Sequence, residues 1–224
     1  MKAMILAAGL GTRMRPLTNY TPKPLLLVGN KPLIEWQIDR LVAAGISEII
    51  INIAHLGWQL PETLGNGERW GIQIRYSDEQ KEGALETAGG IIKALKLLGT
   101  QPFLVVNGDI WCDFDFKGLS LKANNLAHLI LVPNPSHHPQ GDFGLVNERV
   151  LNQSTSPLYT FSGIGLYSPM LFANLPQGKR PLAPLLRAAM SQNRVSGQLY
   201  QGDWRDIGTP ERLHELDEEL TVRT

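Results

Sequence analysis

The sequence predicts an α/β fold with a mostly parallel sheet wrapped by helices. Along the 224-residue chain, short apolar runs alternate with longer segments of helical period, which is the pattern of strand–helix–strand units. The run 3–8 is apolar enough for a strand that is covered on both faces. The hydrophobic fraction of 43% is typical of a globular domain with a substantial core. We therefore expect one domain over residues 1–224.

The expected elements follow one another along the chain. Apolar runs predict strands at 3–8, 47–54, 71–77 and 102–107, and helical periodicity predicts helices at 32–44 and 85–98. Between Phe114 and Tyr167 the runs shorten and Pro, Gly, Asn and Ser become frequent, so we expect a small extra sheet packed onto the core. Thr209, Pro210 and Glu211 favour the start of a final helix, because they supply a hydroxyl cap, an early proline and an early acid. No hexapeptide repeat follows, so no C-terminal β-helix is expected.

Composition excludes several classes of function. The 21 basic and 21 acidic residues balance, and no basic stripe is visible, so nucleic acid is not an expected partner. No apolar stretch approaches the ~18 residues of a membrane span. The single cysteine, Cys112, cannot form an internal disulfide and fits a buried thiol in a reducing compartment. We expect a cytoplasmic protein without membrane association, and its oligomeric state stays open.

A glycine-containing loop follows the first strand and is accompanied by two cations. Gly9 and Gly11 allow a tight turn that brings bare backbone N–H groups against an anion. Arg13 offers a planar fork for phosphate oxygens, and Lys23 offers a mobile point charge. Met14 replaces the third glycine of G-x-G-x-x-G, and no G-x-x-x-x-G-K-[ST] occurs, so two named phosphate motifs are excluded. The loop predicts a nucleotide site, although Gly-x-Gly alone also fits an ordinary turn with surface cations.

Two aspartates are candidates for holding a divalent metal. Asp109 comes directly after the strand 102–107, and ligands of open α/β sheets bind beyond the carboxyl ends of the strands. Asp206 stands in the segment WRDIGTPE at 204–211. Mg²⁺ prefers one or two carboxylates plus substrate oxygens, so the pair suits Mg²⁺ if the fold brings the two together. Taken singly, each aspartate also fits a turn or a helix cap.

Small residues at 83–90 lead into the helix expected at 85–98. The positive helix N-terminus would face a nucleotide, and the small side chains would leave room for a base or a ribose. The alternative is a plain helix start whose glycines serve close packing. Glu79 and Gln80, just before this stretch, are candidate base readers.

Two segments, GLGTRMRPLTNYTPKPL at 9–25 and WRDIGTPE at 204–211, resemble the signature of the sugar-phosphate nucleotidyltransferases. These enzymes join a nucleoside triphosphate to a sugar 1-phosphate and release pyrophosphate. The resemblance implies a Rossmann-like, GT-A-like fold, these two substrates as partners, and Mg²⁺ as cofactor. It implies that Arg13 grips the triphosphate tail and that Lys23 reaches the reacting phosphates, with Asp109 as the third catalytic residue. The implied nucleotide-binding residues are Ala8, Gly9, Gly11, Thr12, Arg13, Lys23, Gln80, Ala84 and Thr87.

Within this family, the chain is most similar to members that transfer a uridylyl group from UTP to N-acetyl-α-D-muramate 1-phosphate in peptidoglycan recycling. The similarity includes the segments VNGDIW at 106–111, TFSGI at 160–164 and LAPLLR at 182–187. It implies Asn107, Asp142 and Ser162 as acceptor-binding residues. Many relatives carry a Glu-Lys-Pro lysine that holds the sugar phosphate, and this chain lacks it, so Lys23 with the metal, or Arg187, would have to assist the acceptor phosphate.

Other interpretations stay open. The same chemistry could use another pair, such as guanylyl transfer to mannose 1-phosphate or thymidylyl or uridylyl transfer to glucose 1-phosphate. A non-catalytic nucleotide-sugar sensor is a further alternative, although such a protein should have lost a metal aspartate or the phosphate lysine. His137 and His138 lie in a Pro/Ser/Asn-rich loop and are expected to face solvent rather than to hold a metal.

Overall fold

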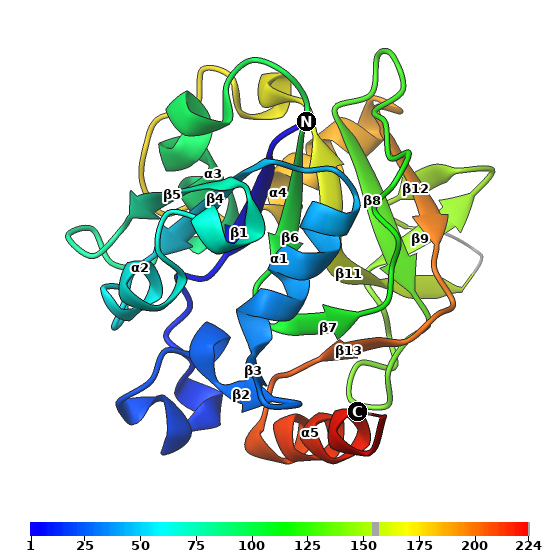
Figure 1. Ribbon diagram of the computed structural model, residues 1–224. Coiled ribbons are helices and arrows are strands. Elements are labelled where there is room, and N and C mark those ends of the chain that lie inside the picture. The colour runs from blue at the N-terminus through cyan, green and yellow to red at the C-terminus, as the bar shows by residue number, and fades with distance from the viewer. Residues whose placement is uncertain (154–156, 224) are drawn as a thin grey trace.

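A nine-stranded mixed sheet forms the centre of the computed structural model, which describes residues 1–153 and 157–223 (Figure 1). The strand order is β5-β4-β1-β6-β11-β8-β12-β10-β9. The strands in the described residues are β1 Ala3–Leu6, β2 Leu27–Val28, β3 Lys31–Pro32, β4 Glu48–Ile53, β5 Gln73–Asp78, β6 Phe103–Asn107, β7 Ile110–Cys112, β8 Ala127–Val132, β9 Phe143–Val146, β10 Arg149–Leu151, β11 Leu158–Tyr167, β12 Val195–Leu199 and β13 Trp204–Asp206. The α-helices are α1 Leu33–Ala43, α2 Gln59–Leu64, α3 Glu86–Leu98, α4 Ala183–Ser191 and α5 Pro210–Arg223.

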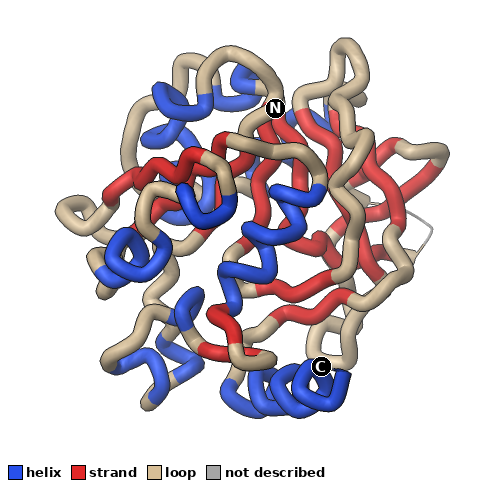
Figure 2. The backbone as a smooth tube through the Cα atoms, viewed as in Figure 1, coloured by secondary structure: helices blue, strands red, loops and turns tan. Residues whose placement is uncertain are grey.

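Helices cover both faces of this sheet (Figure 2). Ile49 and Ile51 of β4 belong to the apolar cluster that includes α1 and α2, whereas Ile50 between them belongs to the cluster that includes α3 and α4 on the opposite face. Alternate side chains of one strand thus enter two separate cores, as the period of two requires. This is why the strand sequences are apolar at successive positions.

The predicted α/β class and the elements of the first half are confirmed, with two differences. β1 ends at Leu6 rather than at residue 8, because the N–H of Ala7 donates to the side chain of Asn52 at 2.8 Å instead of continuing the ladder. The expected small sheet over 114–167 is not separate, since β8 to β11 extend the main sheet. β11 joins them to it, because this ten-residue strand pairs antiparallel with both β6 and β8. The sheet is therefore parallel from β5 to β6 and mixed beyond.

Two small pieces complete the fold around the carboxyl ends of β1 and β6. β7 and β13 form a two-stranded antiparallel ribbon, although nearly the whole second half of the chain separates them. α5 packs through Leu213, Leu216 and Leu220 on a third apolar cluster that includes Met14 of the glycine loop. The N–H of Gly29 donates to Asp217 of α5 at 2.7 Å. Within the described residues, no helix is long and apolar enough to cross a membrane.

Candidate active site

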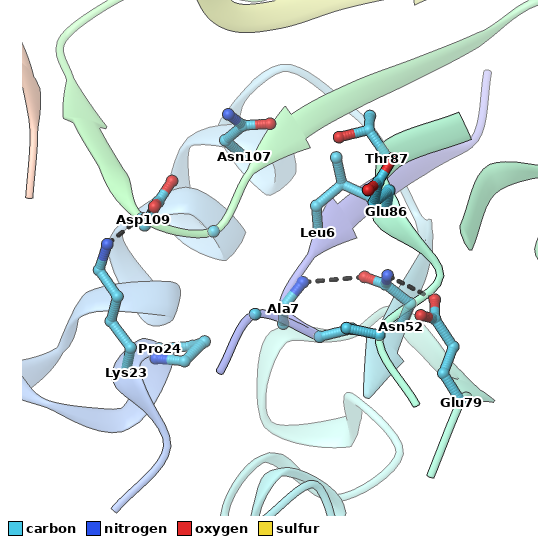
Figure 3. A pocket seen from close by; sticks show the side chains of 14 residues that line it. Leu6, Ala7, Lys23, Pro24, Asn52, Glu79, Glu86, Thr87, Asn107 and Asp109 are labelled. Carbon is cyan, nitrogen blue, oxygen red and sulfur yellow. Dashed lines mark hydrogen bonds and ion pairs between the residues drawn. The ribbon is translucent and has the colours of Figure 1, made fainter. Parts of the chain in front are cut away.

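A cavity of about 210 Å³ opens at the carboxyl ends of β1 and β6, and we call it the first cavity (Figure 3). Its lining contains eight of the predicted site residues, namely Ala8, Gly9, Lys23, Glu79, Ala84, Thr87, Asn107 and Asp109. The other lining residues are Leu6, Ala7, Pro24, Asn52, Glu86 and Gly108. Segments that lie far apart in the sequence therefore converge at the strand ends, where open α/β sheets bind their ligands.

One end of the first cavity carries an ion pair. Lys23 lies in a short 3₁₀-helix, Lys23–Leu25, between two prolines, and its side chain is only 10% exposed. Its Nζ is 2.7 Å from Oδ2 of Asp109, which is 43% exposed (Figure 3). The rigid flanking prolines fix the backbone of Lys23, so the ammonium is held at the cavity rather than free to move through solvent.

The opposite wall is held by a chain of buried hydrogen bonds. Oδ1 of Asn52 accepts from the N–H of Ala7, and Nδ2 of Asn52 donates to Oε1 of Glu79 at 2.7 Å (Figure 3). Oε2 of Glu79 accepts from the N–H of Leu85 at 2.9 Å. Gly90 makes room for this chain, because a Cβ there would lie 2.7 Å from Oε1 of Glu79. The chain ties the start of the glycine loop to the start of α3.

This arrangement gives Glu79 a positioning role that the sequence analysis did not foresee. Its side chain is 1% exposed, and both carboxylate oxygens are engaged by protein donors. The neighbouring Gln80 is exposed, bonds to Asp78 and does not line the cavity. The polar Asn52 inside the apolar strand EIIINI was the sequence signal for this chain of hydrogen bonds.

The glycine loop divides into a part in the first cavity and a part beyond it. Gly9 lines the cavity with no atom within 4 Å of a Cβ built on it. Gly11 has φ +61°, and a Cβ there would lie 2.9 Å from Cγ2 of Thr18, so only this second glycine is required by the fold. Thr12 and Arg13 form a short 3₁₀-helix outside the cavity lining. Nη1 of Arg13 lies 3.5 Å from the Cβ position of Gly208.

The β7–β13 ribbon brings the two predicted metal aspartates to one place. Asp206 lies across from Ile110, and the N–H of Ile207 donates to the carbonyl oxygen of Asp109 at 2.8 Å. Within the part of the chain that is described, no three or more His, Cys, Asp or Glu side chains converge. Two carboxylates beside open cavities suit Mg²⁺, which completes its octahedron with water and substrate oxygens.

Asp206 faces a second cavity, of about 280 Å³. Its carboxylate contacts Nη1 of Arg212, and Nε2 of His137 is 3.1 Å from Oδ1. The cavity is lined by Pro135, Ser136, His137, Trp204, Arg205, Asp206, Arg212 and Glu215. His137 and His138 are each half-exposed, as expected for a loop, but both also contact an aspartate.

The predicted acceptor residues lie in different environments. Asn107 lines the first cavity, where Gly163 leaves space for its amide. Asp142 accepts from the N–H of Phe161 at 2.8 Å and lines neither cavity. Ser162 is buried, donates to the carbonyl of Ile130 at 2.7 Å and lies in the register shift between β11 and β8, so its hydroxyl serves the sheet. Arg187 is exposed on α4 and lines neither cavity.

Comparison with known proteins agrees with this geometry. The family described as "Nucleotidyl transferase" matches residues 2–223. N-acetylmuramate alpha-1-phosphate uridylyltransferase of Neisseria meningitidis serogroup B is 53% identical over 96% of each chain. The protein of the same name from Caulobacter vibrioides is 34% identical over 93% of this chain and 92% of its own.

A solved structure supports the fold independently. A protein of Bacillus anthracis, described as a glucose-1-phosphate thymidylyltransferase, superposes with a TM-score of 0.85 over 99% of this chain and 95% of its own, at 24% identity. At that identity the structural similarity supports the fold only. Because the family match spans nearly the whole chain and the relatives align over almost their full lengths, this chain belongs to the nucleotidyl transferase family.

Proposed function

We propose that this protein transfers the uridylyl group of UTP to N-acetyl-α-D-muramate 1-phosphate, giving UDP-N-acetylmuramate and pyrophosphate in peptidoglycan recycling. The observation that carries the substrate assignment is the 53% identity, over 96% of the chain, to a relative named for this reaction. The Lys23–Asp109 pair at the first cavity, set beside Asp206 by the ribbon, supports the chemistry. Such a reaction needs UTP, so the proposal places the enzyme in the cytoplasm. The free cysteine is consistent with that reducing compartment.

UTP would lie along the first cavity with its phosphates toward the Lys23 end. The backbone at Gly9 is open to an approaching oxygen, and Glu79 and Glu86 line the cavity away from Lys23, where a negative phosphate would be repelled (Figure 3). The uridine would therefore lie near Ala84 and Thr87. Arg13, which lies outside the lining of the cavity, would bind the end of the triphosphate.

The metal would be Mg²⁺, held by Asp109 and Asp206. When bound there it would neutralise the charge of the two phosphates that have to approach each other. Asp109 already contacts Lys23, and Asp206 already contacts Arg212, so each carboxylate is oriented by a cation before substrates arrive.

The transfer itself would be a direct displacement. An oxygen of the sugar 1-phosphate attacks the α-phosphorus of UTP, a new P–O bond forms, and the bond to the bridging oxygen of the pyrophosphate breaks. The bonding electron pair leaves with pyrophosphate, where Lys23 and Arg13 stabilise the developing negative charge. No enzyme-bound intermediate forms.

The test is pyrophosphate release with Mg²⁺. UTP, dTTP, GTP, CTP and ATP are each combined with the 1-phosphates of N-acetylmuramate, N-acetylglucosamine, glucose and mannose. The proposal requires the UTP and N-acetylmuramate pair to have the highest kcat/KM. A better pair, such as GTP with mannose 1-phosphate, would replace the substrates but keep the chemistry. Inactivity with every pair would favour a non-catalytic sensor.

A further inference from the structure

The second cavity lies directly beside the proposed centre of the reaction. Asp206 is part of its lining, whereas Asp109 belongs to the lining of the first cavity. The backbones of the two aspartates are joined through the hydrogen bond from Ile207 to Asp109. Each cavity is therefore lined by one of two aspartates whose backbones lie close together. A transfer between two substrates needs this arrangement, because donor and acceptor must reach the same centre from different sides.

The second cavity also has the size and chemistry for a polar ligand. Its volume of about 280 Å³ is near the lower end of small-ligand pockets, roughly 300–1,000 Å³. Trp204 supplies an aromatic wall, and its Nε1 is bonded to the carbonyl of Ser162 at 2.9 Å, so the ring is fixed in place. Aromatic and charged walls together suit a sugar that carries an acid group.

Cationic side chains gather at the Asp206 end of this cavity. Nη1 of Arg212 lies 3.0 Å from the Cβ position of Gly208, and Nη1 of Arg13 lies 3.5 Å from the same point. Oδ2 of Asp206 lies 3.1 Å from this point as well, so the absent side chain of Gly208 leaves space for the contact between Arg212 and Asp206, with Arg13 outside the cavity lining. His137 approaches Asp206 from the loop that covers the cavity. The lining also carries two acids, Asp206 and Glu215, so an acid ligand would depend on the free donors of one guanidinium rather than on an excess of positive charge.

Arg212 is the cation best placed to take that acid. Arg205, the other arginine of the lining, is already committed, because it donates to both oxygens of Glu219 at 2.7 and 2.8 Å and from Nε to Asp203 at 3.0 Å. Hydrogen bonds to Glu219 raise the pKa of its guanidinium above the ordinary range. Arg212 donates from Nη1 to Asp206, and a guanidinium has five N–H donors, so it can hold a second acid without releasing the first.

We propose that the second cavity is the acceptor site and that Arg212 binds an acid group of the acceptor, in place of the lysine that this chain lacks. The inference rests on the proposed function. The acceptor offers two oxyacids that match a guanidinium fork, the 1-phosphate and the lactyl carboxylate. N-acetylglucosamine 1-phosphate lacks only the lactyl group, so a comparison of the two sugars identifies which acid Arg212 holds.

The experiment compares Arg212→Gln, Arg212→Lys and His137→Gln with the wild type. The measurements are KM for each sugar phosphate, KM for UTP, the Mg²⁺ concentration for half-maximal rate, and the calorimetric affinity for N-acetylmuramate 1-phosphate. Arg75→Gln is the matched control, since this exposed arginine of the edge strand β5 lines neither cavity. Urea midpoints establish that each variant is folded.

In Arg212→Gln we expect KM for N-acetylmuramate 1-phosphate to rise and its affinity to fall by about tenfold or more. KM for UTP should change much less than KM for the acceptor, because Arg212 does not line the first cavity. Arg212→Lys should recover part of the loss, and His137→Gln should show a smaller loss in the same direction. If the preference for the muramate over the glucosamine ester collapses, Arg212 holds the carboxylate. If both esters weaken equally, it holds the phosphate.

Other outcomes would overturn the inference. If Arg212→Gln changes only the Mg²⁺ concentration for half-maximal rate, Arg212 orients Asp206 and does not bind the acceptor. Unchanged affinity of Arg212→Gln for N-acetylmuramate 1-phosphate would lead to the same conclusion. If the wild type binds the muramate ester in the Arg212-dependent way but gives no product with UTP, the proposed function fails while this site survives. If the wild type does not bind the ester at all, the site fails.

Discussion

Glu79→Gln tests whether the buried carboxylate positions the cavity wall or reads the base. Two donors point at Glu79, Nδ2 of Asn52 at 2.7 Å and the N–H of Leu85 at 2.9 Å. A glutamine has one acceptor oxygen, so either orientation of its amide sets an NH₂ group against one of these donors. The change removes one hydrogen bond to a charged acceptor and leaves a buried N–H unpaired. We expect a loss of about 2–4 kcal/mol in the free energy of unfolding, a large part of a typical 5–15 kcal/mol.

Urea unfolding at neutral pH measures this loss as a lower midpoint with an unchanged m-value. Glu82→Gln is the control, because Glu82 is exposed and pairs with Lys93 on the surface, so its midpoint should not move. KM for UTP should also rise in Glu79→Gln, since the hydrogen-bond chain holds both the glycine loop and the start of α3. A variant with the wild-type midpoint but an altered preference among nucleoside triphosphates would refute the reasoning and make Glu79 a base reader.

Further predictions concern the glycine loop, the metal site and the core. Gly9→Ala should fold normally, since a Cβ there meets nothing within 4 Å, yet it should raise KM for UTP about tenfold by displacing a phosphate. Gly11→Ala should lower the free energy of unfolding by about 1–3 kcal/mol, because its φ is +61° and the new Cβ would clash with the side chain of Thr18. Equal urea midpoints of Gly11→Ala and the wild type would contradict this. Asp109→Asn should remain folded but lose about hundredfold or more in kcat with Mg²⁺, and near-normal turnover would remove it from the metal site. Burial raises the pKa of Cys112 to about 11 from 9.0, so the folded protein keeps a proton that the unfolded chain releases, and stability should fall between pH 9 and 11. The fall should be about 3 kcal/mol larger in the wild type than in Cys112→Ala, as measured by urea unfolding across this pH range.

Hydrophobic pattern was enough to predict four sheet strands and two helices of the first half, but not the short elements α2, β2, β3 and β7. Strands such as β4 bury alternate residues in two cores, so their sequences are apolar throughout and easily recognised. The second half was harder, because β9 and β10 are only four and three residues long and their place at the sheet edge depends on pairing with distant strands. Such pairing is a property of the tertiary fold, which local pattern does not contain.

For the candidate site, the sequence predicted residue types better than orientations. Asp206 lies on β13 and Asp109 directly precedes β7, and the N–H of Ile207 donates to the carbonyl of Asp109, so the two backbones are neighbours. That their carboxylates hold a metal stays a prediction. The resemblance implied that Ser162 binds the acceptor sugar. Its hydroxyl is buried, however, and donates to the backbone carbonyl of Ile130 within the sheet. No local sequence pattern pointed to Arg212, because its proposed role depends on the second cavity, to whose lining α5 contributes Arg212 and Glu215.

The packing of α5 has a consequence for how the protein is made. The helix forms an apolar cluster with Met14 and binds Gly29, which is 188 residues away from its partner Asp217. During synthesis the glycine loop and the segment after it emerge early, but their packing partner leaves the ribosome only when α5 does. A chain that stops before α5 would lack the packing partners of Met14 and the acceptor for the N–H of Gly29. The glycine loop should therefore reach its final packing only after α5 has been synthesised.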